Sequence, residues 1–334
     1  MKILITGGCG FVGSNLAIYL KENKIAKKID SLDNLSRQGS FLNYKRLKKK
    51  NIKNFKADIS SSYFLKKLPK YDLIIDCCAE AAVEASKKEI DRVFFTNLVG
   101  TFNILKKCKN DKSNIIFLSS SRIYSISSLR KIKNKNFLIN ENFNTTKPKS
   151  IYGFCKKSSE ELIKEFSYLY NIKYIINRLG VISGPWQFGK QDQGFVSLWV
   201  WNHMNKKKMS YIGFGGKGLQ IRDVVHVSDV CKLIAIQVKK IKSINNLTVN
   251  VGGGRRNAVS LKNLTRICEK ITSHKINISS KKQTSIYDIP YYITDNSMAK
   301  KTYGWFPEKS FLHIVRDVYK WMLSYKKTLK KYIK

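Results

Sequence analysis

Tyr152 and Lys156 stand at the spacing YxxxK, which sets two residue types suited to proton transfer one helical turn apart. On a helix such residues share a face, so the lysine ammonium would lie beside the phenol. A phenol ordinarily loses its proton at about pH 10, and a neighbouring cation favours the phenolate. Tyr152 could therefore act as a general base that takes the proton of a substrate hydroxyl group.

A glycine-rich turn near the N-terminus could bind phosphate groups. Gly7, Gly10 and Gly13 follow a short apolar run at residues 2–6, in the spacing GxxGxxG. The first glycine permits a tight turn, the second lets the backbone approach a pyrophosphate, and the third lets the next helix pack on the strand. Phe11 and Val12 begin that helix. The pattern and its context predict a dinucleotide-binding turn.

An acidic residue follows this turn at the distance expected of a dinucleotide site. Asp33 comes about twenty residues after Gly13, at the end of a second predicted strand, and is followed by Asn34. Its carboxylate would accept hydrogen bonds from the adenosine ribose hydroxyls. Because an acid at this position favours NAD over NADP, we predict NAD as the cofactor.

The elements that must position these residues alternate between strands and helices. Apolar runs predict strands at residues 52–57, 72–78, 114–119 and 174–179, and helical periodicity predicts helices at residues 94–107 and 152–169. Such alternation indicates βαβ units and a parallel sheet covered on both faces. The predicted class is α/β, with a Rossmann-type, doubly wound parallel sheet.

The second half of the chain has a different texture. Glycines, prolines and aromatic residues between positions 184 and 201 interrupt the alternation, which is typical of loops that form a pocket lid. Beyond them we predict helices at residues 222–234, 261–271 and 311–323, and a strand at residues 247–251. The expected organisation is an NAD-binding Rossmann domain at residues 1–180 and a smaller, mainly substrate-binding α+β domain at residues 181–334. Residues 221–251 are expected to return to the Rossmann core.

The composition indicates a cytoplasmic protein without a membrane span. The chain has 334 residues, no apolar stretch of about 18 residues, and an N-terminus that starts directly in a strand. Its seven cysteines lack disulfide-like spacing and are expected to be core thiols in a reducing compartment. The four histidines and the cysteines show no zinc spacing, so no metal site is predicted.

The formal net charge of +40 raises the question of nucleic-acid binding. The lysines are scattered along the whole chain, and lysine, isoleucine and asparagine are abundant together, which indicates compositional drift. We therefore expect no specific nucleic-acid partner. The basic field would instead speed the capture of an anionic substrate, an effect that salt weakens.

Several segments together resemble a known family. They are GGCGFVGSN, DNLSRQGS, the pair Asp58 and Ile59, Asn97 in NLVGT, SSSRIY, YGFCK, GPWQFGKQDQG and QIRDVVHVSD. Over nearly its whole length the chain resembles the extended short-chain dehydrogenase/reductases of the NAD-dependent nucleotide-sugar epimerase/dehydratase family. The last two segments and DNLSRQGS are most similar to those of CDP-paratose/CDP-tyvelose 2-epimerases and their close relatives.

The resemblance implies roles for individual residues. Ser120, four residues before Tyr124 in the family pattern, would hydrogen-bond the reacting sugar oxygen. Tyr152 would act as acid and base, and Lys156 would orient the nicotinamide ribose. The residues implied to hold NAD are Gly7, Gly10, Phe11, Val12, Gly13, Asp33, Asn34, Asp58, Ile59 and Asn97, together with Tyr152 and Lys156.

Two further positions are implied to face the nucleotide part of a nucleotide-sugar substrate. Gln193 and Arg222 would contact the diphosphate or the base, because a guanidinium pairs well with phosphate oxygens. For Arg222 the alternative is a structural salt bridge with Asp223 or Asp229.

Departures from the family pattern bear on the sugar side. Ser121 and Arg122, both expected near the substrate, stand where dehydratases of the family have an Asp-Glu pair, which argues against 4,6-dehydration. Glu80 and Glu84 either hydrogen-bond sugar hydroxyls or are solvated carboxylates at a helix start. Trp186 replaces the arginine of the usual GPR turn.

The implied reaction is inversion of one hydroxyl-bearing carbon of a nucleotide-linked hexose, by transient oxidation to a keto sugar and hydride return to the opposite face. C2 of a CDP-sugar is favoured; C4 of a UDP-sugar and a net dehydrogenase or reductase reaction are the alternatives. A catalytically idle dinucleotide-sensing or scaffold protein is a further alternative, against which the intact Ser120, Tyr152 and Lys156 argue. The resemblance also implies a homodimer that pairs through the helices at residues 94–107 and 152–169.

Overall fold

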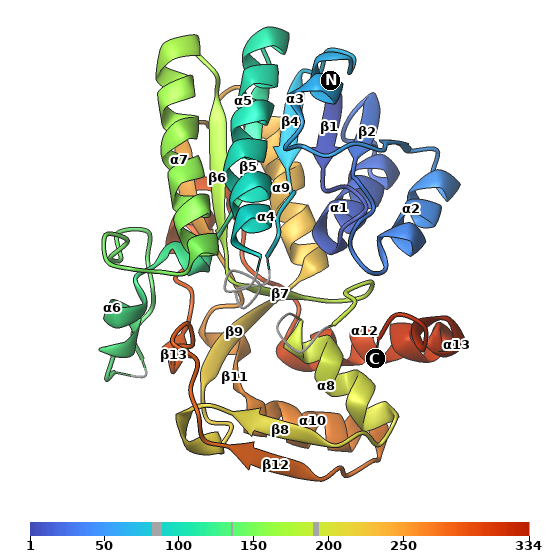
Figure 1. Ribbon diagram of the computed structural model, residues 1–334, viewed down its shortest axis with the longest axis vertical. Helices are drawn as coiled ribbons and strands as arrows, with labels where there is room; N and C mark the ends of the chain where they lie inside the picture. Colours follow the sequence, from blue (N-terminus) through green and yellow to red (C-terminus); the bar gives the residue numbers. More distant parts are fainter. Residues whose placement is uncertain (82–88, 135, 190–193, 334) are drawn as a thin grey trace. The chain divides into compact units, whose positions relative to one another are not determined.

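In the computed structural model, which describes residues 1–81, 89–134, 136–189 and 194–333, the first apolar run forms β1 (Lys2–Thr6). This strand lies inside a seven-stranded sheet with the order β10-β6-β5-β4-β1-β2-β3 (Figure 1). The pairings of β1 with β2 and β4, of β2 with β3, of β4 with β5 and of β5 with β6 are parallel. The other six strands are β2 (Lys28–Leu32), β3 (Lys53–Phe55), β4 (Leu73–Asp76), β5 (Asn114–Ser120), β6 (Tyr174–Leu179) and β10 (Leu247–Val251).

Helices cover both faces of this sheet, as parallel strands with crossover connections require. On one face α5 (Gly100–Asp111) and α7 (Ile151–Tyr170) run side by side (Figure 1). On the other face α9 (Val227–Lys240) reaches β6, where Asn177 and Gln237 exchange two amide hydrogen bonds. The predicted doubly wound α/β class is therefore confirmed. The remaining helical segments here are α1 (Phe11–Glu22), α2 (Ser40–Lys49), α3 (Ser62–Lys66), α4 (Ile90–Phe94), the π-helix η2 (Phe95–Val99) and the 3-10 turn η3 (Ser121–Ile123).

The chain divides into two compact units. Unit 1 holds the seven-stranded sheet and comprises Met1–Ile123, Ser150–Leu179 and Val230–Val249. Unit 2 comprises Tyr124–Lys149, Gly180–Asp229 and Asn250–Lys334. This division differs from the expected boundary at residue 180 in that residues 124–149 belong to unit 2. Of residues 221–251, which were expected to return to the Rossmann core, residues 230–249 belong to unit 1.

Unit 2 contains two small sheets. In the first, β9 (Ile221–His226) pairs antiparallel with β11 (Ala258–Ser260) and parallel with β7 (Val181–Ser183) and β13 (Tyr291–Tyr292). In the second, β8 (Met209–Ile212) pairs with β12 (Ile278–Lys281). The helical segments are α6 (Ile126–Arg130), α8 (Phe195–Met204), η4 (Phe214–Gly216), η5 (Arg255–Asn257), α10 (Leu261–Thr272), α11 (Ser297–Tyr303), α12 (Phe311–Ser324) and α13 (Lys326–Leu329).

The helix predicted at residues 222–234 is wrong over its first part. Residues 221–226 form β9, and α9 begins only at Val227. A short apolar run is compatible with either a strand or a helix, and here three neighbouring strands supply the hydrogen bonds that decide between them. The strands predicted at residues 2–6, 114–119, 174–179 and 247–251 and the helices at residues 152–169, 261–271 and 311–323 are confirmed, with small shifts at their ends.

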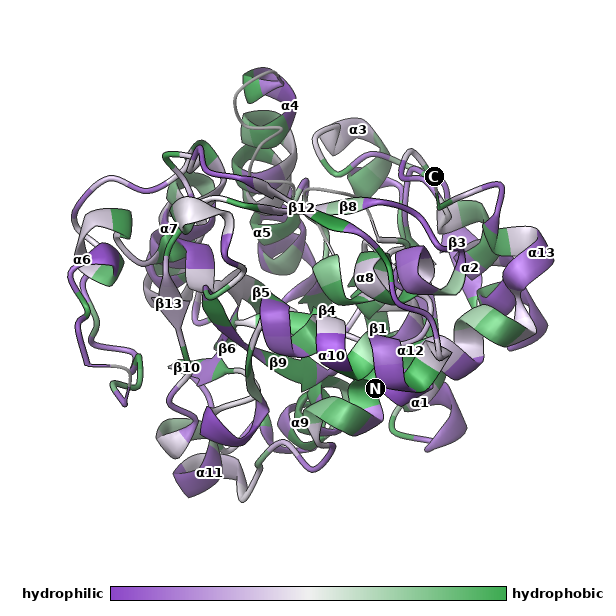
Figure 2. Cartoon of the chain, turned by 90° about the horizontal axis from the view of Figure 1, so that it is seen from below, coloured by the Kyte–Doolittle hydropathy of each residue, from purple (hydrophilic) through white to green (hydrophobic). Residues whose placement is uncertain are grey.

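Each unit has its own apolar core. In unit 1 the core joins inward-facing strand residues such as Leu4, Ile74 and Phe117 to Ile104 of α5 and Ile163 of α7. Figure 2 shows helices that carry both hydrophilic and hydrophobic residues, as expected where one helix face is buried and the other is exposed to solvent. Of the helices within the described ranges, none combines the length and the apolar character needed to cross a membrane.

Candidate active site

The glycine turn after β1 has the geometry of a phosphate-binding turn. Gly7 adopts a left-handed φ of +61°, and the N–H of Gly10 donates to Gly7 O at 2.9 Å. A Cβ atom on Gly13 would lie 2.3 Å from Gly7 O, so only glycine lets α1 approach the turn this closely. Within the described chain, no side chain caps α1 and no acid lies in its first turn. The N–H groups of Phe11 and Val12 at this helix start can therefore face an anion.

A cavity of about 290 Å³ opens beside this turn, entirely within unit 1. It brings together residues from the ends of β1, β2 and β4 and from the segments that follow them, where ligands of open α/β sheets bind. The sequence-predicted residues that line it are Gly7, Gly10, Asp33, Asn34, Asp58, Ile59 and Glu80.

Asp33 is held rigidly at the end of β2. Its carboxylate accepts the N–H of Cys9 at 3.0 Å and the N–H of Leu35 at 2.8 Å. Burial raises the pKa of Asp33, although these hydrogen bonds act in the opposite direction. A fixed carboxylate beside a glycine turn fits the ribose hydroxyls of NAD, and the site therefore suits this cofactor.

Asp58 lies on the other wall of the same cavity. Burial acts to raise its pKa, but the hydrogen bonds from Ser60 and Asn34 and the positive charge of Arg92 lower it overall. The amide of Asn34 donates to Asp58 at 2.7 Å, which joins the loop after β2 to the loop after β3. Asp58 is thus a carboxylate kept ionised at the cavity wall.

Asn97, predicted to contact NAD, is fully buried in η2 and contacts the protein backbone. Its side chain accepts the N–H of Glu80 at 3.1 Å and donates to the carbonyls of Glu80 at 3.1 Å and Val93 at 2.9 Å. In this structure Asn97 fixes the path of the chain after β4.

Glu80 points its carboxylate at two arginines. Its Oε2 lies 2.7 Å from Nη2 of Arg92, and its Oε1 lies 3.8 Å from Nη1 of Arg37. Both arginines line the cavity with Glu80. Neither interpretation offered for Glu80 from the sequence included this ion-pair cluster, and Glu84 lies outside the described residues.

Tyr152 and Lys156 are buried on the first turns of α7, with exposed fractions of 6% and 1%. The hydroxyl of Ser150 caps this helix by accepting the N–H of Gly153 at 3.1 Å, which fixes where the helix begins. The ammonium of Lys156 donates to the carbonyl of Leu118 at 2.9 Å and to that of Cys78 at 3.5 Å. Lys156 therefore ties α7 to the carboxyl ends of β5 and β4.

Ser120 is the last residue of β5. Its hydroxyl accepts the N–H of Arg122 at 3.1 Å, within the 3-10 turn that Ser121 begins. Unit 1 thus holds Ser120, Tyr152 and Lys156 on two adjoining elements, β5 and α7. Ser120 offers a hydroxyl, Tyr152 a phenol and Lys156 a cation, the set that proton transfer to and from a hydroxyl group needs.

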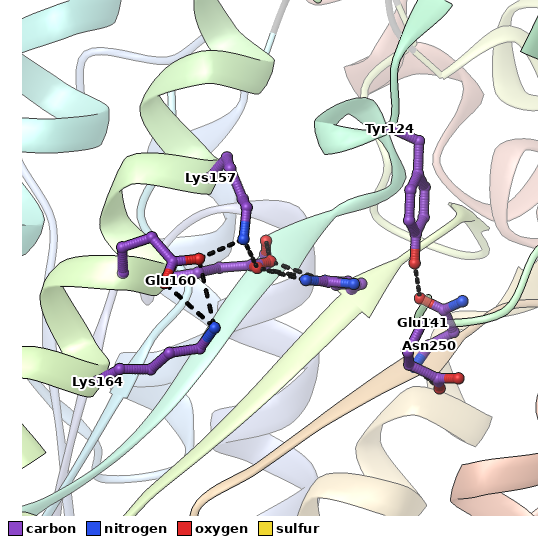
Figure 3. Close-up of polar contacts among 9 residues, drawn as sticks. Tyr124, Glu141, Lys157, Glu160, Lys164 and Asn250 are labelled. Carbon is purple, nitrogen blue, oxygen red and sulfur yellow. Dashed lines mark hydrogen bonds and ion pairs between the residues drawn. The ribbon is translucent and has the colours of Figure 1, made fainter. Parts of the chain in front are cut away.

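A buried ion pair joins α7 to β6, and a hydrogen bond to the same carboxylate joins α7 to β5; Glu160 is labelled in Figure 3. The carboxylate of Glu160 on α7 accepts from the guanidinium of Arg178 on β6, with a shortest distance of 2.8 Å, and from the hydroxyl of Ser119 at 2.5 Å. Glu160 is fully buried and Arg178 is 5% exposed. The sequence analysis missed this network, because nothing in the local pattern marks partners from a helix and two strands.

Arg222 forms an ion pair with Asp288, a partner that was not considered from the sequence. Its Nη2 lies 2.8 Å from Oδ1 of Asp288 and donates to the carbonyl of Ile289 at 2.5 Å. Asp288 lies 66 positions further along the chain, so this ion pair joins β9 to a distant segment. Gln193, the other residue predicted to face the nucleotide, lies outside the described residues.

Trp186 occupies the place of the expected arginine and packs within unit 2. Its ring lies 4.7 Å from that of Tyr325 and 5.7 Å from that of Trp321, measured between centroids. The backbone at Trp186 has a left-handed φ of 71°. An aromatic anchor for the C-terminal helices thus replaces a cation at this turn.

The chain is similar to proteins that act on nucleotide sugars. A model of the "NAD dependent epimerase/dehydratase family" matches residues 3–252. CDP-paratose 2-epimerase of Salmonella typhi is 27% identical over 351 residues, covering 97% of this chain and 100% of that protein. dTDP-D-glucose 4,6-dehydratase of Dictyostelium discoideum is 30% identical over 253 residues, covering 72% of this chain and 56% of that protein. Among solved structures, UDP-glucose 4-epimerase from Thermotoga maritima with UDP-glucose matches with a TM-score of 0.84 at 25% identity, covering 98% of this chain and 100% of that one.

Proposed function

Since the chain belongs to the NAD-dependent epimerase/dehydratase family, we propose that it is an epimerase that inverts one hydroxyl-bearing carbon of a nucleotide-linked hexose. The family is NAD-dependent, and NAD is the cofactor. When bound, it would take a hydride from the sugar carbon and return it to the opposite face. Among the residues that would hold it, Gly7, Gly10, Asp33, Asn34, Asp58 and Ile59 line the cavity of unit 1.

The chain's own groups would move the proton. Tyr152 would take the hydroxyl proton as the sugar carbon is oxidised and give it back when the carbon is reduced. Ser120 would hydrogen-bond the same sugar oxygen, and Lys156, held by the carbonyl of Leu118, would orient the nicotinamide ribose. The burial of Tyr152 and Lys156 would keep bulk water from these groups.

One observation carries the choice of epimerisation over dehydration. The turn that follows Ser120 presents Ser121 and Arg122, and neither can act as the carboxylic acid that expels water from the sugar. A keto sugar formed in this pocket would therefore be reduced again. Ser121 and Arg122 are proposed to contact the sugar instead.

The finer assignment is a CDP-sugar 2-epimerase similar to CDP-paratose/CDP-tyvelose 2-epimerases. Its support is the likeness to CDP-paratose 2-epimerase along the full length of both chains. The likeness to a UDP-glucose 4-epimerase structure supports the alternative of C4 inversion on a UDP-sugar. A net dehydrogenase or reductase would need NAD or NADH to exchange in every turnover.

Proton NMR of the purified protein with a panel of CDP- and UDP-hexoses, without added cofactor, tests the function. A new anomeric signal from one substrate identifies the base and the inverted carbon together. Turnover that appears only with added NAD or NADH would support a net redox enzyme. No conversion of any hexose under either condition would contradict the proposal.

The assembly and location are also proposed. Unit 1 would bind NAD, and unit 2 would bind most of the nucleotide sugar, with Arg222 near the diphosphate.

Exposed aromatic residues support a homodimer that pairs through α4, η2, α5 and α7. Among them are Phe95, Phe102 and Phe154. All seven cysteines are free thiols, which supports a reducing compartment such as the cytoplasm.

A further inference from the structure

The cavity of unit 1 contains two arginines that are already engaged by a carboxylate. Glu80 contacts Arg92 at 2.7 Å and Arg37 at 3.8 Å, and all three side chains line the cavity. The side chain of Glu80 is 12% exposed, whereas those of Arg37 and Arg92 are 33% and 50% exposed. The carboxylate is thus the buried centre of the cluster, and the arginines are its outer arms.

Glu80 is also the fixed member of the cluster. The side chain of Asn97 binds both the N–H and the carbonyl of Glu80, each at 3.1 Å, and Asn97 is itself fully buried. Arg37 lies in the loop before α2, where its carbonyl accepts from the N–H and the hydroxyl of Ser40. The long arginine side chains can change conformation on these fixed backbones, but the carboxylate cannot follow them far.

The charges of the cavity disfavour an additional phosphate. Its described lining includes three carboxylates, Asp33, Asp58 and Glu80, and two guanidinium groups, Arg37 and Arg92. A guanidinium binds phosphate oxygens well when it is available. Here both guanidinium groups pair with Glu80, so an incoming phosphate would have to replace a carboxylate that stays nearby and repels it.

We propose that Glu80 is a specificity-determining residue, which withholds Arg37 and Arg92 from the extra phosphate of NADP and so helps the cavity to select NAD. The proposal rests on the placement of NAD in this cavity under the proposed function. NADP differs from NAD by one phosphate on the adenosine ribose, the sugar that Asp33 is expected to bind. Glu80 would then be a second acid that discriminates, acting through two cations and not by direct repulsion alone.

The test compares the binding of NAD and NADP to the full-length protein, freed of bound cofactor, by isothermal titration calorimetry. We expect Glu80→Gln to raise the affinity for NADP relative to NAD by roughly fivefold to tenfold. The matched control is Glu89→Gln. Glu89 pairs with the same arginine, Arg92, at 2.8 Å, but it is not among the described residues that line the cavity. The control removes a negative charge that pairs with the same arginine. It should leave the ratio of the NADP affinity to the NAD affinity within about twofold of the starting protein.

Two further variants test whether Arg37 is an arginine that binds the extra phosphate once the charge of Glu80 is removed. In Glu80→Gln combined with Arg37→Met, the gain in NADP affinity should largely disappear. Arg37→Met alone should leave the ratio unchanged, because Glu80 withholds Arg37 in the natural protein; this variant also tests the idea if Glu80→Gln does not fold. Circular dichroism and thermal unfolding establish that each variant is folded.

The outcomes separate this proposal from the proposed function. If folded Glu80→Gln binds NAD and its ratio of NADP affinity to NAD affinity is unchanged, the role of Glu80 is overturned but the cofactor site is not. An equal change of the affinity ratio in Glu89→Gln overturns the role of Glu80 too, since any negative charge near Arg92 would then be enough to disfavour NADP. A natural protein that binds neither nucleotide contradicts the cofactor site itself and removes the basis of both proposals.

Discussion

The hydroxyl of Ser119 donates to the carboxylate of Glu160 at 2.5 Å and so joins a strand residue next to Ser120 to a helix residue one turn after Lys156. Ser119 is the register partner of Arg178 on the neighbouring strand, and Arg178 donates to the same carboxylate. The network therefore joins β5, β6 and α7 at the level of the proposed catalytic residues. Its partners are buried, so it contributes to unit 1 as a core element.

We predict that Glu160→Gln lowers the free energy of unfolding by about 3 kcal/mol, because it removes the charge that compensates a buried guanidinium. Urea unfolding followed by circular dichroism measures the change. The matched control is Glu161→Gln on the next position of α7, whose carboxylate is 50% exposed and pairs with Lys157 and Lys164. The control should cost less than about 0.5 kcal/mol. Equal losses in the two variants would contradict the structural role of Glu160.

Tyr152→Phe should lower the rate of epimerisation roughly 10²- to 10⁴-fold, because it removes the group that moves the proton. The assay uses the hexose identified by NMR, and NAD released from denatured protein is measured by chromatography. The amount of bound NAD should not change, since the phenyl ring still fills the buried site. The control is Tyr168→Phe on the same helix, which is 88% exposed and should retain full activity. Activity of Tyr152→Phe within about twofold of the natural protein would exclude the proposed proton transfer.

The fold and the cofactor turn could be predicted because their signals are local. Gly7, Gly10 and Gly13 encode a turn through their spacing, and strand and helix periods are visible in short windows. YxxxK likewise encodes one helix face. Such patterns report what a segment does with its own neighbours in the chain.

The parts that could not be predicted depend on partners distant in sequence. Arg222 pairs with Asp288, and Glu160 meets Ser119 and Arg178 from two strands; no spacing rule points to these partners. The strand β9 was mistaken for a helix because its pairing strands lie in other parts of the chain. Arg37 lies in the segment DNLSRQGS, but only the structure of the cavity shows that it faces Glu80.

NAD affinity should depend on pH through Asp33. Burial raises the pKa of this carboxyl, and only the ionised form can accept hydrogen bonds from both ribose hydroxyls. Affinity is therefore fully present above the raised pKa and falls as the pH drops through it, at a higher pH than the ordinary value of 3.8 would give. Calorimetric titration across the acid range measures the profile.

Asp33→Asn is the variant that tests this assignment. It should weaken NAD binding roughly tenfold or more at neutral pH and flatten the acid-side dependence. Asp91→Asn, at the exposed start of α4, should keep both the affinity and the profile of the natural protein. A natural protein whose affinity is constant down to the ordinary range of an aspartate would contradict the role of Asp33.

The homodimer should dissociate when a charge is placed on its proposed helical face. Phe154 on α7 is 51% exposed, and we expect Phe154→Glu to give a monomer, because an apolar contact would be replaced by an unpartnered charge. Size-exclusion chromatography with light scattering measures the mass. Phe306→Glu, at a site of 55% exposure in unit 2, is the control and should stay dimeric. A monomeric natural protein, or equal dissociation of both variants, would contradict this interface.

Gly13→Ala tests whether the turn after β1 holds the cofactor. The new Cβ would lie 2.3 Å from Gly7 O and 2.8 Å from Gly8 Cα, both backbone atoms of the turn. Since neither atom can rotate away, the turn and α1 must separate, and we expect a loss of about 1 to 3 kcal/mol in unfolding free energy. NAD affinity should fall at least about tenfold, because the N–H groups at the start of α1 move with the turn.

The comparison variant for this prediction is Gly304→Ala. Gly304 has a left-handed φ of +67°, but among the described residues no atom beyond its chain neighbours lies within 4 Å of its Cβ position, so the substitution introduces backbone strain without a clash. It should cost roughly 1 to 2 kcal/mol in stability and leave NAD affinity unchanged. The two variants thus have similar stability losses and different cofactor affinities if the turn binds NAD. Retention of full NAD affinity by a folded Gly13→Ala protein would place the pyrophosphate elsewhere.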